Sequence, residues 1–396
     1  MTTIQSNRVD AELVLESVDP MINLTNDLND LGLDLDNDIA VIAFLGCIAR
    51  RFGEAQWILF TGESGCGKTF LRSVIRDCVP VEERLSYEYA TEKALLYRAP
   101  ADGGHLDLSQ YVLIGDERKS GKDDHAYLRT LYSEKSLEYS VAKVDGTMTL
   151  KLKGRPALLE TTTDSGISIE DQNRRMILVV DESVQKKEKI VEYKNKVAAR
   201  SLDIDPAQIT GIYQEVQRML PQVECVQIPY SEGIVPRVQS LSAISRVHDQ
   251  LLTTTKAIAL MRHKKRHIDK KLLICELEDY DLAHYLLSPL HNALVSGVED
   301  QERDMILSIQ KKVSSMPMAN PKKKKFTTND IGEWTGLGRG TRERRIKKAV
   351  ESGLLRQVTA GRRGVAHEYE LGDVQAILTQ VQLFPSSQEL RASGYR

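Results

Sequence analysis

Short apolar runs alternate with helical patterns over the first half of the chain. Residues 39–52 are apolar over a length that predicts a buried helix. Short apolar runs bounded by polar or glycine-rich sequence predict strands at 57–61, 85–89, 111–115, 157–161 and 176–180. Strands that alternate with helices are typical of α/β domains with a mainly parallel sheet. We therefore predict an α/β core at residues 39–183.

The rest of the chain divides by pattern into five further segments. Residues 184–312 are almost wholly helical in pattern and predict a helical subdomain attached to the sheet. Residues 313–325 combine proline, serine, asparagine and a lysine run, which is typical of a linker. Residues 326–372 predict a second compact domain, and residues 373–396 form a tail without an assigned role. Residues 1–38 are weakly patterned, so they form a short helix or stay loose.

Charge is distributed unevenly along a chain of ordinary composition. The 396 residues suffice for two or three domains, and 41% hydrophobic with 28% charged residues excludes a chain that is disordered throughout. The net charge is −2, but residues 1–40 hold nine acids and one base, whereas residues 322–367 hold thirteen lysines and arginines and four acids. A basic region near the C-terminus indicates a local surface for a polyanion such as nucleic acid.

Cysteine usage and the N-terminal sequence bear on localisation. Five scattered cysteines without a CxxC pair are typical of reduced thiols in the cytoplasm, not of disulfides or a metal site. Acidic residues precede any apolar run, so we expect no signal peptide. The longest apolar stretch has eleven residues, against ~20 for a membrane span. We expect a cytoplasmic protein without a membrane partner.

A phosphate-binding motif follows the predicted strand at 57–61 and precedes a predicted helix. The motif G-x-x-x-x-G-K-[ST] comprises Gly62, Glu63, Ser64, Gly65, Cys66, Gly67, Lys68 and Thr69. Glycines let backbone N–H groups approach phosphate oxygens, and the helix N-terminus adds its positive dipole end. We expect Lys68 to reach the β- and γ-phosphates and Thr69 to hold Mg²⁺. The motif therefore predicts ATP and Mg²⁺ as cofactors.

A second acidic element ends the predicted strand at 111–115. Asp116 and Glu117 follow this strand, some 50 residues after the phosphate-binding motif. We expect Asp116 to bind Mg²⁺ and Glu117 to polarise the attacking water as a general base. Together the two motifs predict Mg²⁺-dependent nucleotide hydrolysis.

A helix and a hairpin are predicted between residues 127 and 152. Two alternating runs flank Asp145-Gly146, which is a strong hairpin turn signal, and Lys143 lies near the tip. With the two preceding motifs, this arrangement resembles AAA+ ATPases that carry a hairpin before the sensor strand. The chain is most similar to minichromosome-maintenance (MCM)-type helicases and to the ATPase half of phage and mobile-element primase-helicases. The resemblance covers roughly residues 40–287 and includes the runs at 154–163 and 170–183.

The resemblance implies a P-loop AAA+ core with a helical lid, assembled into a ring that we expect to be a hexamer. It implies that Thr162 or Thr163 is the sensor 1 residue, which orients the attacking water. It also implies that Arg174 is the arginine finger directed at the neighbouring subunit's γ-phosphate, with Arg175 as second choice. A trans arginine stabilises transition-state charge and makes hydrolysis depend on assembly.

Two further roles follow from the same resemblance. Arg246, on a helix of the lid, resembles sensor 2, with Arg237 as second choice. Lys143 resembles the hairpin lysine that grips single-stranded DNA in a central pore. The chain departs from MCM helicases because only about 20 residues separate Ala90 from the Asp116 strand, too few for their long insert. We also find no large N-terminal DNA-binding region and no primase motif, so a partner primase or replication protein is expected.

The C-terminal unit resembles a winged helix. Helical patterns at 328–335 and 341–352 precede two alternating runs at 354–359 and 366–371. We predict that one helix face presents Arg342, Arg345 and Lys348, and that the wing presents Arg362 and Arg363. Arginines can bind guanine edges or phosphates, so this unit is expected to bind duplex DNA. The open alternative is a protein-docking winged helix with a solvated basic face.

Two functions remain open at this point. The first is an ATP-dependent DNA helicase or translocase in the replication of a phage or mobile genetic element. The second is an ATP-switched, origin-binding initiator or a helicase loader that does not unwind DNA. The hairpin lysine favours the first, whereas the missing N-terminal DNA-binding region favours the second.

Overall fold

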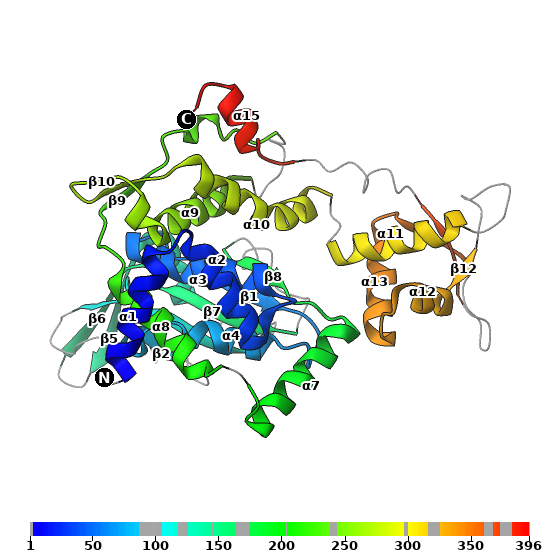
Figure 1. Cartoon of the computed structure of the whole chain (residues 1–396), viewed down its shortest axis with the longest axis horizontal. Helices are drawn as coiled ribbons and strands as arrows, with labels where there is room; N and C mark the ends of the chain where they lie inside the picture. Colours follow the sequence, from blue (N-terminus) through cyan, green and yellow to red (C-terminus); the bar gives the residue numbers. More distant parts are fainter. Residues whose placement is uncertain are drawn as a thin grey trace.

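The structure is a computed structural model, drawn in Figure 1, and it describes most of the chain. The described residues are 3–86, 95, 98, 105–117, 126–143, 146–163, 174–202, 204–237, 244–296, 300–315, 325–359, 367–372 and 382–395. Within these ranges, no helix combines the length and the apolar character needed to cross a membrane.

The acidic N-terminal segment is folded and contributes to the main core. Its elements are α1 (Thr3–Glu16), α2 (Pro20–Leu28) and the π-helical turn η1 (Asn29–Leu33). Leu15, Leu24 and Leu28 are buried in the same hydrophobic cluster as the central sheet. These leucines cover the helical layer beside the sheet, so residues before the expected boundary at 38 share the core with the residues after it.

Five parallel strands form the central sheet in the order β2-β4-β7-β1-β8. They are β1 (Trp57–Thr61), β2 (Arg84–Ser86), β4 (Val112–Glu117), β7 (Ala157–Thr162) and β8 (Met176–Val179). Each lies at an apolar run that predicts a strand. The prediction of an α/β fold with a parallel sheet is confirmed, and all five carboxyl ends meet at one edge.

The two faces of the sheet pack against different layers because successive strand residues point to opposite sides. Ile58 and Phe60 lie in the cluster formed with the helical layer, whereas Trp57 lies in a second cluster on the other face. The helical layer includes α3 (Asn37–Ile48), the 3₁₀ turn η2 (Ala49–Phe52) and α4 (Lys68–Asp77); a further 3₁₀ turn, η3 (Val81–Glu83), precedes β2.

The second face is covered by the predicted helix and hairpin. The elements are α5 (Ala126–Glu134), β3 (His105–Asp107), β5 (Ser136–Lys143) and β6 (Gly146–Lys153), with sheet order β3-β6-β5. Tyr127 and Tyr139 pack edge to face at 5.5 Å between ring centroids. The last strand pair is Lys143 with Gly146, so Gly146 belongs to β6 and not to the predicted turn, while residues 144–145 lie outside the described residues.

The segment after the sheet is mainly helical but includes a small sheet. Its helices are α7 (Val184–Ala199), α8 (Pro206–Met219), η6 (Ser231–Gly233), α9 (Ile244–Met261), η7 (His263–Lys265) and α10 (Leu277–Ser296). The strands β9 (Cys225–Gln227), β10 (Ile268–Asp269) and β11 (Leu272–Ile274) pair in the order β10-β11-β9. These strands were missed because two or three residues are too few to show a periodic pattern.

A separate C-terminal unit has its own hydrophobic cluster and lies at the right of Figure 1. Its elements are α11 (Asp300–Ser315), β12 (Phe326–Thr327), α12 (Thr328–Thr335), α13 (Arg339–Glu351), β13 (Leu355–Thr359) and β14 (Glu368–Leu371). Met305, Ile306 and Ile309 of α11 are buried in this cluster with Phe326. Helix α11, which precedes the expected boundary at residue 326, therefore shares the core of this unit, and most of the predicted linker lies outside the described residues.

The tail returns to the helical segment and packs on α10 through α15 (Ser387–Ala392). Phe384 is buried beside His291, at 5.3 Å between ring centroids, and its carbonyl faces His284 Nε2 at 3.3 Å. The Tyr280 hydroxyl donates to the Pro385 carbonyl at 2.5 Å. The C-terminal unit is thus flanked on both sides in sequence by segments that belong to the main core.

Acid is expected to loosen this tail contact. Burial lowers the pKa of His291 from 6.5 to about 3 and also lowers the pKa of His284. Between about pH 6.5 and 3 the unfolded chain therefore binds more protons at His291, so stability falls as pH falls. We expect the unfolding free energy of the wild type to fall more steeply than that of His291→Gln, by up to about 1.4 kcal/mol per pH unit. Urea titrations at several pH values measure this difference; parallel slopes would contradict the expectation.

Candidate functional site

The loop between β1 and α4 turns through three glycines with positive φ. These are Gly62 (151°), Gly65 (84°) and Gly67 (97°), and such angles are unfavourable for residues with a Cβ. A Cβ at Gly62 would also lie 2.8 Å from Cys66 Sγ. Burial raises the pKa of the Cys66 thiol, so it stays protonated. Because these positions carry no side chain, the backbone of the loop can closely approach a group bound in the adjoining cavity.

Lys68 begins α4 and curls back over this loop. Its Nζ donates to the Gly62 carbonyl at 2.8 Å and to the Glu63 carbonyl at 2.6 Å, and the side chain is buried. A cation held inside a ring of backbone groups at a helix N-terminus forms an anion-binding arrangement.

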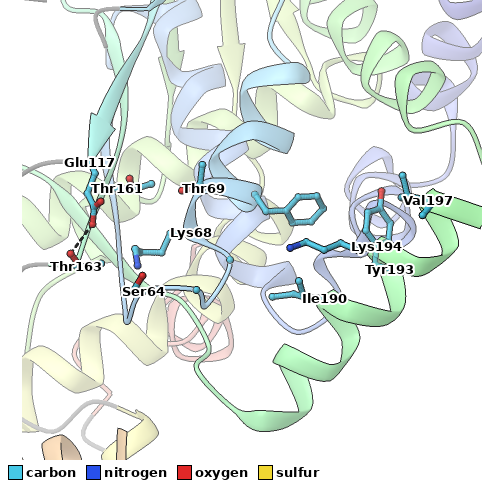
Figure 2. Close-up of a pocket in the computed structure, with 15 residues that line it drawn as sticks. Ser64, Lys68, Thr69, Glu117, Thr161, Thr163, Ile190, Tyr193, Lys194 and Val197 are labelled. Carbon is cyan, nitrogen blue, oxygen red and sulfur yellow. Dashed lines mark hydrogen bonds between the residues drawn. The ribbon is translucent and has the colours of Figure 1, made fainter. Parts of the chain in front are cut away.

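Glu117 stands at the carboxyl end of β4, beside the end of β7. The pairing of β4 with β7 shifts by one residue between Ile114 and Glu117, which brings Glu117 opposite Thr161. The Thr163 hydroxyl donates to Glu117 Oε1 at 2.7 Å (Figure 2). Of the two predicted threonines, Thr162 is buried and Thr163 makes this hydrogen bond to Glu117. The side chain of Asp116 lies outside the described residues.

One cavity of about 570 Å³ connects these groups (Figure 2). Its polar end is lined by Ser64, Lys68, Thr69, Glu117 and Thr163. Polar groups from β1, β4 and β7 meet here because the parallel strands deliver their carboxyl ends to one edge of the sheet.

The other end of the cavity is mainly apolar and was not predicted, although Lys194 of α7 also contributes to its lining (Figure 2). It is lined by Ile190, Tyr193 and Val197 of α7, together with Phe70 and Gly32. The rings of Phe70 and Tyr193 lie 5.5 Å apart, and a Cβ at Gly32 would come within 2.9 Å of the Tyr193 ring. The spacing 190, 193 and 197 places these side chains on one helix face, which was the available signal. A pocket with one cationic and one aromatic end suits a phosphate attached to a flat ring.

A charged cluster supports the loop from behind. The Asp36 carboxylate accepts the Asp181 N–H at 3.0 Å and contacts the Lys186 ammonium. A Cβ at Gly67 would lie 3.6 Å from Lys186 Cε, so Lys186 lies directly against the loop. Burial lowers the pKa of Lys186 to about 7, and the charge of Asp34 opposes this shift.

The predicted arginines separate in space. Arg175 is buried, donates from Nε to Glu160 Oε2 at 2.8 Å and lies 5.3 Å from the Trp57 ring, so it cannot serve as a trans finger. Arg174 is half-buried. Arg246 lies on an exposed face of α9 and does not line the cavity, so its expected approach to nucleotide is not met here. Arg237 instead pairs with Glu389 of the tail at 2.5 Å.

The predicted basic face of the C-terminal unit is only partly exposed. Arg345 is buried, so the expectation that it lies on an open face is wrong. Arg342 is half-buried against Gly332, and Lys348 pairs with Glu302 of α11 at 3.5 Å. The cause is α11, which packs on this unit together with α12 and covers part of that side of α13. Arg362 and Arg363 lie outside the described residues.

Similarity to solved structures is weak. A candidate ATPase from Cytophaga hutchinsonii is 14% identical, with 70% of this chain and 86% of that chain covered and a TM-score of 0.37. JCV helicase is 13% identical (75% and 74% covered, TM-score 0.32), as is the Aeropyrum pernix ORC1 protein in complex with DNA (87% and 91% covered, TM-score 0.27). These scores carry no functional inference. No curated protein matches the chain.

A family model gives a firmer result. The model described as the MTBMA_p00010 P-loop domain matches residues 7–220, which is more than half of the chain. The matched region contains the glycine-rich loop, Glu117, Thr163 and every residue that lines the cavity. Its start at residue 7 agrees with the packing of α1 into the core. The chain therefore belongs to the MTBMA_p00010 P-loop domain family.

Proposed function

We propose that this protein is a Mg²⁺-dependent ATPase of AAA+ type that assembles into a ring and moves DNA during the replication of a phage or mobile element. The observation that carries the hydrolytic part is the Thr163–Glu117 hydrogen bond of 2.7 Å at the polar end of the cavity. Thr163 directly follows β7, which lies between β1, the strand before the loop, and β4, the strand of Glu117. This arrangement holds a carboxylate beside the phosphate site.

In this proposal, each polar residue at the cavity has a separate role in ATP hydrolysis. Lys68 and the loop amides bind the phosphates and balance their charge. The oxygen ligands of Thr69 and Asp116 suit Mg²⁺, which would add charge neutralisation at the phosphates when bound. Glu117 takes the proton of the attacking water, and Thr163 holds that carboxylate in place. Tyr193 and Phe70 supply apolar surface for the nucleobase.

The proposed assembly gives a role to the arginine at position 174. A ring would place Arg174 at the neighbour's phosphates, where a cation stabilises the charge of the transition state. Its neighbour Arg175 is committed to Glu160, which leaves Arg174 as the finger of this proposal.

DNA binding is proposed for two regions. The element order α11-β12-α12-α13-β13-β14 supports a winged helix, in which Arg342, Lys348 and the wing arginines Arg362 and Arg363 would contact duplex DNA. Lys143 at the end of β5 would contact single-stranded DNA in the pore. Because these contacts neutralise phosphates, binding should weaken steeply with salt.

The motor and the initiator are distinguished by one experiment. For a motor, we expect ATP-dependent strand displacement on a forked duplex, loss of displacement in Lys143→Ala, and retention of ATP hydrolysis in that variant. Lys151→Ala on the neighbouring strand, where Lys151 pairs with Glu138 at 2.9 Å, is the matched control and should displace normally. An initiator or loader would instead footprint one duplex sequence tightly and displace no strand, which would overturn the motor.

A further inference from the structure

Glu182 is a buried carboxylate directly behind the glycine-rich loop. It lies between β8 and α7, and its side chain is fully shielded from solvent. One oxygen, Oε1, accepts the N–H of Glu63 at 2.6 Å. The same oxygen would lie 3.2 Å from a Cβ at Gly62. Glu182 therefore fixes the first turn of the loop through a backbone hydrogen bond.

The other oxygen of Glu182 binds a residue from the C-terminal unit. Oε2 accepts a hydrogen bond from the Arg344 guanidinium, which also approaches Glu63 Oε1 at 4.0 Å. One turn earlier on α13, a Cβ at Gly340 would lie 3.6 Å from the same Glu63 oxygen. Helix α13 thus contacts the loop region through the carboxylates of Glu63 and Glu182, each of which lies more than 100 residues before α13 in the sequence.

The negative charge of Glu182 affects the binding of any phosphate that enters the cavity. A buried carboxylate repels an anion nearby and is costly to bury unless it is paired. Arg344 supplies the opposite charge. Burial also lowers the pKa of Arg345, and the charge of Glu182 opposes that shift, which shows how closely α13 approaches the carboxylate.

We propose that Glu182 and Arg344 couple the nucleotide loop to the C-terminal unit: docking of α13 through Arg344 neutralises Glu182 and so strengthens nucleotide binding. Arg344 is a positioning residue in this scheme and does not touch the nucleotide. Because such coupling is reciprocal, bound nucleotide strengthens the docking of the C-terminal unit by the same factor. The inference depends on the nucleotide binding proposed above, but not on motor activity or DNA.

A double-mutant cycle in the full chain tests the charge argument. We expect Arg344→Ala to weaken the binding of a fluorescent, non-hydrolysable ATP analogue with Mg²⁺ by roughly 10-fold, a typical size for coupling between sites. Glu182→Gln keeps the oxygen that accepts the Glu63 N–H but removes the charge. Adding it to Arg344→Ala should therefore restore affinity to near the wild-type value. Arg339→Ala, on the exposed side of the same helix, is the matched control and should bind normally.

The outcomes are distinct. An Arg344→Ala variant that binds the analogue as tightly as the wild type would overturn the coupling. So would a double variant as weak as Arg344→Ala, since a purely structural loss would not be rescued by removing a second partner. A wild type that binds no analogue would instead refute the proposed nucleotide binding. Circular dichroism of each variant establishes that it is folded.

The reciprocal effect, in which bound nucleotide strengthens the docking of the C-terminal unit, is measured as a distance between two spin labels. Spin labels at Lys347→Cys on α13 and Glu192→Cys on α7 report docking, with the exposed Cys225 changed to serine because the other four cysteines are buried. We expect the analogue to narrow the distance distribution when Arg344 is present and to leave it broad in Arg344→Ala. Equal responses in the two backgrounds, or no response in either, would contradict the coupling.

Discussion

Replacing Glu117 with glutamine is expected to leave nucleotide binding intact and to lower the hydrolysis rate by about 10²–10⁴-fold. Glutamine has nearly the same shape and still accepts the hydrogen bond that Thr163 donates at 2.7 Å. It cannot take a proton from water, so only the chemical step is lost. Phosphate release under saturating ATP measures the rate, and binding of an ATP analogue measures the affinity.

The control for this variant is Glu134→Gln, which changes an exposed glutamate at the end of α5, away from the cavity. It should hydrolyse ATP at the wild-type rate. Unchanged turnover in Glu117→Gln would remove Glu117 from its role as general base. A parallel loss of nucleotide affinity would mean that the carboxylate serves binding and not proton transfer.

The largest expected effect on stability is at Arg175. Replacing it with alanine leaves the Glu160 carboxylate buried without its partner and removes the guanidinium that lies 5.3 Å from the Trp57 ring. Breaking a buried ion pair from one side typically costs about 3–5 kcal/mol. We therefore expect the free energy of unfolding to fall by about that amount, as measured by urea titration.

The adjacent arginine provides the comparison. Arg174→Ala should lose less than about 1 kcal/mol of stability because the side chain is only half-buried, yet it should abolish most ATP hydrolysis. Mixing Arg174→Ala with Lys68→Ala subunits should restore part of the activity, since each supplies what the other lacks at a shared interface. Equal stability losses at 174 and 175, or no recovery on mixing, would contradict this division of roles.

The features of the site that form within a single segment can be predicted from the sequence of that segment. The glycine-rich loop requires positive φ at positions 62, 65 and 67, and only glycine adopts such angles freely, so the motif itself predicts the turn. The apolar runs of the five strands predict the parallel sheet, because buried parallel strands need apolar side chains on both faces. A parallel sheet in turn brings Glu117 and the loop to the same edge.

Only the tertiary structure decided where each of several similar residues lies. Thr162 and Thr163 differ by one strand position, and the pleat turns one into the core and the other toward Glu117. The same holds for Arg174 and Arg175, of which one meets the buried Glu160. On α13, the packing of α11 and α12 decides how much of each basic side chain is exposed.

The contacts between distant segments also could not be predicted from the sequence. The apolar wall around Tyr193, the return of Phe384 to α10, and the Glu182–Arg344 pair each join segments from separate parts of the chain. The sequence by itself determined the phosphate loop, the acidic strand end and the layered core, because short-range periodicity and backbone sterics specify them. The tertiary structure decided burial and pairing, because these depend on which surfaces the folded chain brings together.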